Sequence, residues 1–257
     1  MRIILLGFVA SLAAGLATGV GALPCLFFRR VSERWLHTML GFAAGVMLAA
    51  TSFSLIIPAI DIGTDQMEWS ALRTVVVVLA GILAGGGFID RAAAWLPHEH
   101  FFTGREGPDI ALRRIWLFVI AITIHNFPEG LAVGVGFGSG DLRSALTLAT
   151  GIALQNMPEG LAVAMPLMAL GYGRWRALWI ATATGLVEPV GGLLGATAVA
   201  YFRPVLPFAM GFAAGAMLFV ISDEIIPETH SKAHARIATF GVLIGFVVMT
   251  GMDILLG

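Results

Sequence analysis

The stretches that decide the architecture of this chain are HNFPEGLAV at residues 125–133 and QNMPEGLAV at residues 155–163. Each lies inside a long apolar segment and contains one glutamate, Glu129 or Glu159, without a lysine or arginine close to it in that segment. An ionisable side chain at the centre of a membrane helix costs about 2.5–3.5 kcal/mol on insertion scales. The two glutamates therefore predict a polar interior in which a bound metal ion supplies the counter-charge.

The polar residues of each motif share one face of a helix. His125 and Asn126 precede Glu129 by four and three positions, spacings that bring side chains together on a helix. The second motif repeats this pattern with Gln155, Asn156 and Glu159. Pro128 and Pro158 each remove a backbone donor and press on the carbonyl four residues back, which favours an opened helix at that level. Two such antiparallel helices would offer carboxylates, an imidazole and amides to one cavity.

The composition indicates a membrane protein. The 257 residues are 58% hydrophobic and 12% charged, with a mean hydropathy of +0.90, whereas soluble domains carry about 25% charged residues. The net charge of −1 gives no reason to expect a nucleic-acid partner, and the single cysteine, Cys25, excludes an internal disulfide. The expected fold class is an all-α integral membrane protein in a lipid bilayer.

Hydropathy divides the chain into eight spans, which we expect to form a single transmembrane domain. The predicted spans are residues 3–28, 36–60, 71–95, 112–137, 143–170, 175–200, 204–227 and 235–256. A cleaved signal peptide is the alternative for the first, but its apolar run continues to Phe28 and favours a retained helix of about 20 or more residues. The longest polar connection, residues 97–114, contains Gly104, Gly107 and Pro108 and predicts a flexible loop.

Basic residues predict the orientation in the membrane. Eleven lie around the connections that follow spans one, three, five and seven, against four on the opposite side. Cytoplasmic loops carry the excess of Lys and Arg, so both termini are expected outside. The larger set is Arg29, Arg30, Arg34, Arg91, Arg105, Arg113, Arg114, Arg174, Arg176, Lys232 and Arg236.

A second internal repeat pairs residues 41–58 (GFAAGVMLAATSFSLIIP) with residues 211–227 (GFAAGAMLFVISDEIIP), with one residue of slip. Because spans two and seven run in opposite directions, the copies predict an inverted repeat of spans one to three against spans six to eight around the central pair of spans four and five. Transporters built this way hold substrate near the midplane between the halves. Chance similarity between two Gly/Ala-rich spans is the alternative explanation.

Two more residues extend the candidate site. Glu188 stands in GLVEPVGG at residues 185–192 of span six, so three isolated carboxylates could balance two divalent ions. Met47 of span two offers a thioether, which suits softer metals, although methionine more often fills gaps in a core.

The paired motif resembles the signature of the ZIP (Zrt/Irt-like) family of divalent metal transporters, and the bacterial GufA-like branch looks closest. The resemblance covers essentially the whole chain. It implies a binuclear site, a homodimer and a place in the bacterial cytoplasmic (inner) membrane. The implied ligands of the first metal are Met47, His125, Glu129, Gln155 and Glu159, and those of the second are Asn126, Asn156 and Glu188, with Glu129 and Glu159 bridging.

Two residues depart from the family pattern. The second motif begins with Gln155 where many members have histidine, and Asn156 stands where close relatives can carry a carboxylate. Both changes weaken ligation, so the first metal site is the firmer expectation.

Polar residues near the span ends suggest a path for the ion. Asp61 and Asp253 lie at outer ends, where they form either an acidic funnel that concentrates cations or ordinary solvated charge. At the inner end, the candidates for an exit relay are Asp223, Glu224, His230 and His234. A possible cytosolic metal site in the loop after span three comprises His98 and His100.

The leading hypothesis is transport of a divalent transition metal, most simply Zn2+ taken up into the cytoplasm, with no resident cofactor. One bundle, such as spans one, four, five and six, would move against the rest. Cd2+, Fe2+, Mn2+ and Co2+ are alternative cargoes, since affinity order alone does not set selectivity. A membrane metalloenzyme is the second hypothesis, but catalytic zinc usually has three protein ligands and only His125 lies deep in a span. A structural polar cluster is the third, and the insertion cost of three carboxylates opposes it.

Overall fold

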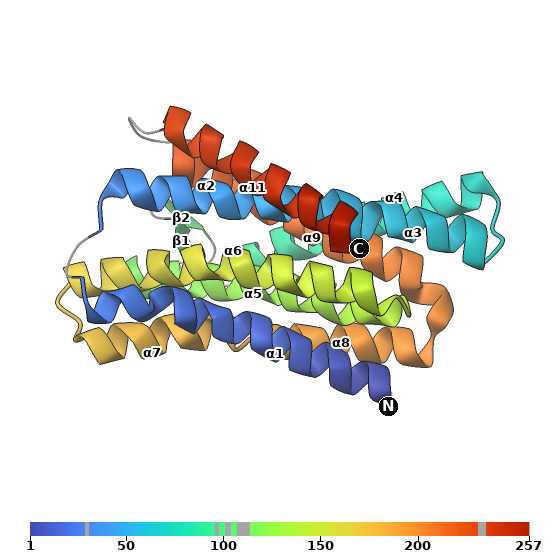
Figure 1. Cartoon of the computed structure of the whole chain (residues 1–257), viewed down its shortest axis with the longest axis horizontal. Helices are drawn as coiled ribbons and strands as arrows, with labels where there is room; N and C mark the ends of the chain where they lie inside the picture. Colours follow the sequence, from blue (N-terminus) through green and yellow to red (C-terminus); the bar gives the residue numbers. More distant parts are fainter. Residues whose placement is uncertain (29–30, 96–97, 101–103, 107–113, 231–234, 257) are drawn as a thin grey trace.

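The computed structural model describes residues 1–28, 31–95, 98–100, 104–106, 114–230 and 235–256. Within them, eight long helical segments run side by side along the long axis of the molecule (Figure 1). In chain order they are α1 (Arg2–Ala22) with η1 (Leu23–Leu26); α2 (Glu33–Ala49) continued by η2 (Ala50–Ile56), α3 (Ile57–Asp61) and η3 (Ile62–Gln66); α4 (Ala71–Trp95); α5 (Arg114–Gly138); α6 (Leu142–Ala169); α7 (Arg174–Gly185) followed by α8 (Glu188–Tyr201); η4 (Arg203–Val205) with α9 (Leu206–Val220), η5 (Ile221–Ile225) and α10 (Ile226–His230); and α11 (Ala235–Leu256).

The second and third segments differ from the predicted pattern at their ends. The helix of span two continues to Gln66 instead of ending near residue 60, because Ile62 and Gly63 of η3 are buried against the protein. After α4, the connection expected to be a loop contains two short antiparallel strands, β1 (His98–His100) and β2 (Gly104–Glu106).

Prolines have different effects in the three motif-bearing spans. α5 and α6 continue through Pro128 and Pro158. In span six, α7 ends at Gly185 and α8 begins at Glu188. Pro189 explains this break, because its ring would clash with the carbonyl of Gly185 four residues back and it lacks a backbone N–H. The break leaves Glu188 at the beginning of a helix.

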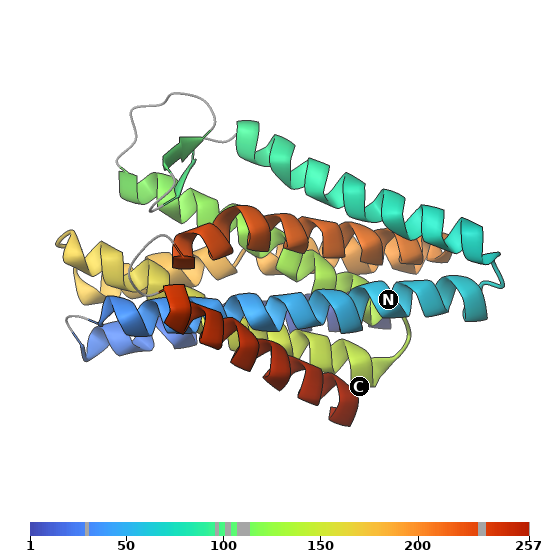
Figure 2. The same cartoon turned by 90° about the horizontal axis from the view of Figure 1, so that it is seen from above.

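The segments form two layers (Figure 1). In one layer, α1 packs on α6, α7 and α8, and α5 packs on α8. In the other, α2 packs on α11 and α4 packs on α9, and Figure 2 shows α4 and α11 at opposite edges of the bundle. α6 contacts α2 and α5 contacts α9, so the motif helices lie at the boundary between the layers.

Glycines permit the close helix pairs of the second layer. At four positions in each pair, an added Cβ would overlap a backbone carbonyl of the partner helix. Without side chains in the way, the helix backbones approach closely, as small residues allow in membrane proteins. The positions are Gly41, Gly45, Gly241 and Gly245 between α2 and α11, and Gly81, Gly85, Gly211 and Gly215 between α4 and α9.

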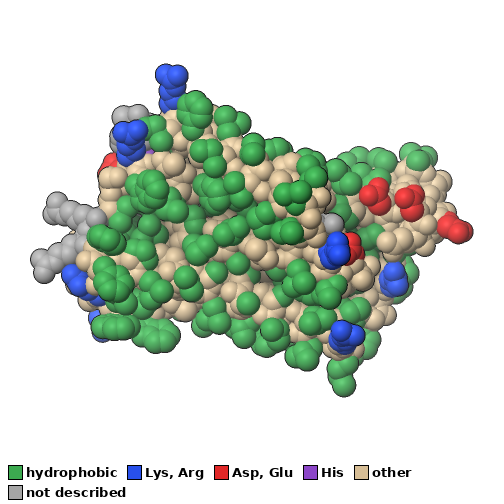
Figure 3. Space-filling model, viewed as in Figure 1, with side chains coloured by type: hydrophobic (Ala, Val, Ile, Leu, Met, Phe, Trp, Pro, Cys, Tyr) green, Lys and Arg blue, Asp and Glu red, His purple; other side chains and the backbone are tan. Residues whose placement is uncertain are grey.

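Hydropathy and surface composition identify a multi-pass membrane protein. Seven of the helical segments are long and apolar enough to cross a membrane. The remaining segment, α6, carries the second polar motif and is surrounded by α1, α2, α5, α7 and α11, so it needs little apolar surface of its own. Figure 3 shows apolar side chains over the middle of the molecule and charged side chains gathered towards its two ends. Both termini lie at the same end of the bundle (Figure 1).

Candidate metal centre

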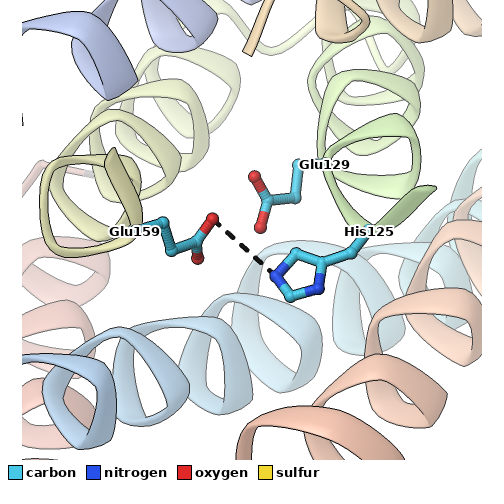
Figure 4. Close-up of side chains that lie close together, drawn as sticks. All are labelled: His125, Glu129 and Glu159. Carbon is cyan, nitrogen blue, oxygen red and sulfur yellow. Dashed lines mark ion pairs between the residues drawn. The ribbon is translucent and has the colours of Figure 1, made fainter. Parts of the chain in front are cut away.

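α5 and α6 bring three side chains of the two motifs to one point. His125 and Glu129 come from α5, Glu159 comes from α6, and the three side chains point towards one another (Figure 4). One ligand atom from each lies within 4.8 Å of the others. Their exposed fractions are 2%, 0% and 1%. A buried imidazole with two carboxylates is a donor set that suits a divalent transition metal.

His125 lies between carboxylates from two different helices. Its Nδ1 is 3.0 Å from Glu224 Oε2, and its Nε2 is 3.8 Å from Glu159 Oε2. Glu224 belongs to η5 and is itself buried, with 6% of its surface exposed. A carboxylate partner of this kind fixes the tautomer and ring orientation of a metal-binding histidine. With its proton on Nδ1, the ring donates to Glu224 and directs the Nε2 lone pair towards the centre.

Gln155 contacts the centre differently. Its Nε2 donates a hydrogen bond to Glu129 Oε1 across the α5–α6 pair. Its own Oε1 and Glu129 Oε2 are buried and have no hydrogen-bond partner among the residues that the structure describes. The amide therefore positions one carboxylate and leaves two oxygen atoms available at the centre.

A second polar group adjoins the first at the break in span six. Glu188 is fully buried at the start of α8, where the partial positive charge of a helix N-terminus favours a carboxylate. Asn156 Nδ2 donates to Glu188 Oε1 at 2.7 Å and to the Ala14 carbonyl at 2.9 Å. A Cβ at Gly130 would overlap the backbone of Glu188, so this glycine permits the approach that brings α8 against α5.

Buried polar atoms without a hydrogen-bond partner concentrate at these two groups. Folded proteins pair the large majority of such atoms, because leaving them unpaired is costly. In the described part of the chain, the set at this site comprises Asn126 Oδ1 and Nδ2, Glu129 Oε2, Gln155 Oε1, Asn156 Oδ1, Glu159 Oε1 and Oε2, and Glu188 Oε2. Most are oxygens that can ligate a divalent cation or hold its water. The arrangement fits a cationic cargo better than a polar core that satisfies itself.

Met47 is fully buried in α2, within the apolar core between the layers. Packing is sufficient to explain this burial, so its role as a sulfur ligand stays a prediction. Asp223 is exposed and lines a groove between α4 and η5 with Asp90, whereas its neighbour Glu224 reaches His125. Both acidic residues were predicted at the exit, but they face different surroundings.

A cavity of about 530 Å³ opens between the layers at the end that carries Asp61. Asp61, Asp141 and Arg203 are its charged lining residues. Asp253 is absent from the lining but accepts a hydrogen bond at 2.8 Å from Ser54 Oγ, which does line it. The expected entrance residues are thus at or beside one cavity, which we call the outer cavity after the predicted orientation of the chain.

Asp141 is a residue that sequence analysis missed. It caps the N-terminus of α6 by accepting from the backbone N–H groups of Arg143 and Ser144. The Ser144 hydroxyl, which donates to its carboxylate at 2.7 Å, is the main cause that lowers the pKa of Asp141 from 3.8. An aspartate directly before an apolar span is an N-cap signal, and that signal could have located it.

The remaining predicted site residues cannot be placed. The side chains of His98, His100 and His230, and the whole of His234, lie outside the described residues.

The chain is similar to known membrane proteins over most of its length. The family described as ZIP Zinc transporter matches residues 105–253. Zinc transporter ZIPB of Bordetella bronchiseptica is 46% identical over 95% of this chain and 80% of its own length. Zinc transporter GufA of Myxococcus xanthus is 45% identical over 98% of this chain and 99% of its own length. Zinc transporter ZIP11 of Homo sapiens is 35% identical over 93% of this chain and 94% of its own length.

Proposed function

Because this chain belongs to the ZIP zinc transporter family, we propose that it takes Zn2+ up across a membrane through the buried centre of α5 and α6. The observation that carries the proposal is the convergence of His125, Glu129 and Glu159 within 4.8 Å inside a bundle of membrane helices. Family membership also makes the chain a transporter and leaves the metalloenzyme hypothesis without support. Cd2+, Fe2+, Mn2+ and Co2+ are alternative cargoes of the same donor set.

In the first metal site, His125 Nε2 and the carboxylates of Glu129 and Glu159 bind the ion. The two carboxylates balance its double positive charge, while Gln155 holds Glu129 in place and Met47 completes the set. A second ion would take Asn126, Asn156 and Glu188, with the two motif glutamates bridging. A mixed oxygen and nitrogen set of this kind binds moderately, as transport requires, because the ion must also leave.

The ion path is inferred from the polar residues on either side of the centre. At the outer end, the ion enters the outer cavity at Asp61 and Asp141, beside the Ser54–Asp253 pair. On the inner side, Glu224 is the first carboxylate beyond His125 and would receive the ion as it leaves, with Asp223, His230 and His234 further along an exit relay. A cytosolic metal site at His98 and His100 remains a proposal of the same kind.

Movement of one layer against the other would expose the centre to each side in turn. Supporting this, the ligands on α5, α6 and α8 belong to one layer, whereas Met47 and Glu224 belong to the other. The glycine-lined pairs α2–α11 and α4–α9 give the second layer two stiff units. The layer of α1 and α5–α8 corresponds to spans one, four, five and six.

The inverted repeat is also a proposal, and three features support it. Each repeated sequence folds as an α-helix followed by a π-helical segment before its proline, η2 before Pro58 and η5 before Pro227. The pair α2–α11 corresponds to the pair α9–α4, with glycines at the contacts of both. The pair α1–α6 likewise corresponds to α8–α5.

Orientation and assembly follow as further proposals. The excess of Lys and Arg at one end supports a cytoplasmic inner end, with both termini outside. The resemblance to bacterial members supports the cytoplasmic (inner) membrane and a homodimer.

The direct test is uptake of Zn2+ into proteoliposomes that contain a fluorescent zinc indicator. Wild-type chain should admit Zn2+, and Glu129→Ala and Glu159→Ala should not. Glu33→Ala removes an exposed carboxylate from the first turn of α2, outside the outer cavity and outside the groove of Asp223, and should transport normally. Unchanged zinc entry in both glutamate variants would contradict the assignment of the site.

A further inference from the structure

The outer cavity contains a basic side chain among its acidic ones. Arg203 lines it together with Asp61 and Asp141. The guanidinium Nη2 donates to Gln66 Oε1 at 3.2 Å. Among the described residues, no carboxylate oxygen lies within 4.0 Å of a guanidinium nitrogen of Arg203, the limit for an ion pair. A positive charge therefore stands at the entrance for cations without being cancelled by direct contact.

The other polar side chains of the cavity wall all offer oxygen. They are Ser54, Asp61, Gln66, Ser139, Asp141 and Ser144. Carboxylate, hydroxyl and amide oxygens are the ligands that Ca2+ and Mg2+ prefer. The buried centre differs, because His125 adds an imidazole that suits Zn2+ better than these hard cations.

Charge therefore decides what can occupy the cavity. The two carboxylates in the lining contribute −2, apart from the neighbouring carboxylate of Asp253 that is bonded to Ser54. Arg203 reduces this sum to −1, because a guanidinium stays charged at any physiological pH. The remaining negative charge still attracts cations, but it holds each divalent ion more weakly.

We propose that Arg203 limits how long any divalent cation stays in the outer cavity, so that the hard cations Ca2+ and Mg2+ do not block the zinc entrance. The inference rests on the proposed function and deepens it. Arg203 opposes every divalent cation at the mouth, but only a cation that prefers the imidazole of His125 gains a stronger site further in. Ca2+ and Mg2+ bind no more strongly at the buried centre and therefore dissociate from the cavity. Gln66 acts as a positioning residue that holds the guanidinium at the cavity wall.

The test measures the initial rate of Zn2+ uptake into proteoliposomes, with added Ca2+ as the competitor. Arg203→Gln should make Ca2+ inhibit uptake at about fivefold lower concentration and should lower the apparent KM for Zn2+. The direction follows because loss of one positive charge from the cavity wall strengthens the attraction of that wall for a divalent ion at low ionic strength. Because salt screens such interactions, the difference should shrink at about 0.5 M monovalent salt.

Three further variants make the outcome specific. Arg203→Lys keeps the charge and should behave like wild type towards Ca2+. Arg73→Gln removes a charge that lies over the Trp69 ring outside the cavity lining, and it should also leave Ca2+ inhibition unchanged. Arg203→Gln combined with Asp141→Asn restores the charge sum of −1 and should return Ca2+ inhibition towards the wild-type value.

Unchanged Ca2+ inhibition in Arg203→Gln, or an equal change in Arg73→Gln, would overturn the role of Arg203. Zinc uptake that still depends on Glu159 in that same preparation would leave the proposed function intact. Conversely, a wild-type chain that admits no Zn2+ would overturn the proposed function itself.

Discussion

The motif on α5 and the motif on α6 place their glutamates at one buried centre, but the residue four positions before each glutamate has a different partner. His125 of the first motif contacts Glu224, which lies in the opposite layer. Gln155 of the second motif contacts Glu129 within its own layer. The first motif is therefore tied to the relative position of the layers, whereas the second holds its geometry independently of it.

This difference suggests that the two motifs have different roles during transport. Displacement of the layers would change the surroundings of His125 and leave the Gln155–Glu129 contact in place. The first motif would then respond to the transport cycle, and the second would keep a carboxylate in position throughout. Four predictions test the comparison.

The largest loss of zinc affinity is expected at the glutamates, which the two motifs share. Glu129→Gln and Glu159→Gln each remove one anionic ligand without changing side-chain size, so each should lower zinc affinity by more than about 100-fold, beyond the loss typical of outer-shell changes. Calorimetric titration of the purified chain with Zn2+ measures this. Wild-type affinity in either variant would mean that the glutamates are not equivalent ligands.

Exchanging the first residue of each motif should have the next largest effect. His125→Gln removes the imidazole ligand but leaves both motif carboxylates, so it should weaken Zn2+ binding by at least about tenfold, the lower end of the loss for outer-shell changes. Gln155→His should tighten binding by about tenfold and slow release, which lowers the maximal uptake rate. Parallel titration and uptake measurements separate the two results, and an unchanged uptake rate with tighter binding would argue against release from this site.

Removing the contact between layers should have a smaller effect, confined to the first motif. Glu224→Gln should lower zinc affinity by about tenfold, because the ring of His125 loses its charged partner. In a His125→Gln background the same change should add little, since the two residues act together. Independent, additive losses in the double variant would show that Glu224 acts without His125.

The smallest effect concerns the beginning of α6. Asp141→Ala removes the N-cap of the second motif helix and should cost about 1 kcal/mol of stability, measured as a lower unfolding temperature in detergent. Folding lowers the pKa of Asp141 from its ordinary value of 3.8. Its negative charge therefore contributes its full stabilisation of the fold at pH values above 3.8.

That stabilisation should disappear as pH falls through the lowered folded pKa. The wild type and Asp141→Ala should therefore converge at low pH. Asp141→Asn keeps an acceptor for the cap without the charge, so it should retain part of the stability and show less dependence on pH. A constant difference between wild type and the alanine variant down to the lowest pH would contradict the assignment.

The general architecture could be predicted from the sequence because membrane spans are long and apolar. The predicted range 71–95 coincides with α4, and 235–256 coincides with α11. The break in span six was harder to foresee, because Pro128, Pro158 and Pro189 all lie within apolar spans and only the last one ends a helix. Tertiary packing around each proline decides whether the helix continues.

The residues of the buried centre could be predicted from spacing within each motif. The residues that surround the centre could not. His125, Asn126 and Glu129 share a helix face by spacing alone. The contact of His125 with Glu224 joins residues 99 positions apart, and no local pattern indicates it. Arg203 and Asp141 also line one cavity only because the fold brings their helices together, and no local sequence pattern indicates that cavity.

The glycine-lined contact of α2 with α11 has a consequence for biosynthesis. The glycine face of α2 is synthesised before its partner α11, which begins only at Ala235. At a synthesis rate of about 5–20 residues per second, α2 lies in the bilayer for roughly 10–40 s before α11 is available to pack on that face. During this interval lipid or another protein must cover the glycine face of α2, so deletion of α11 should leave that face without its partner.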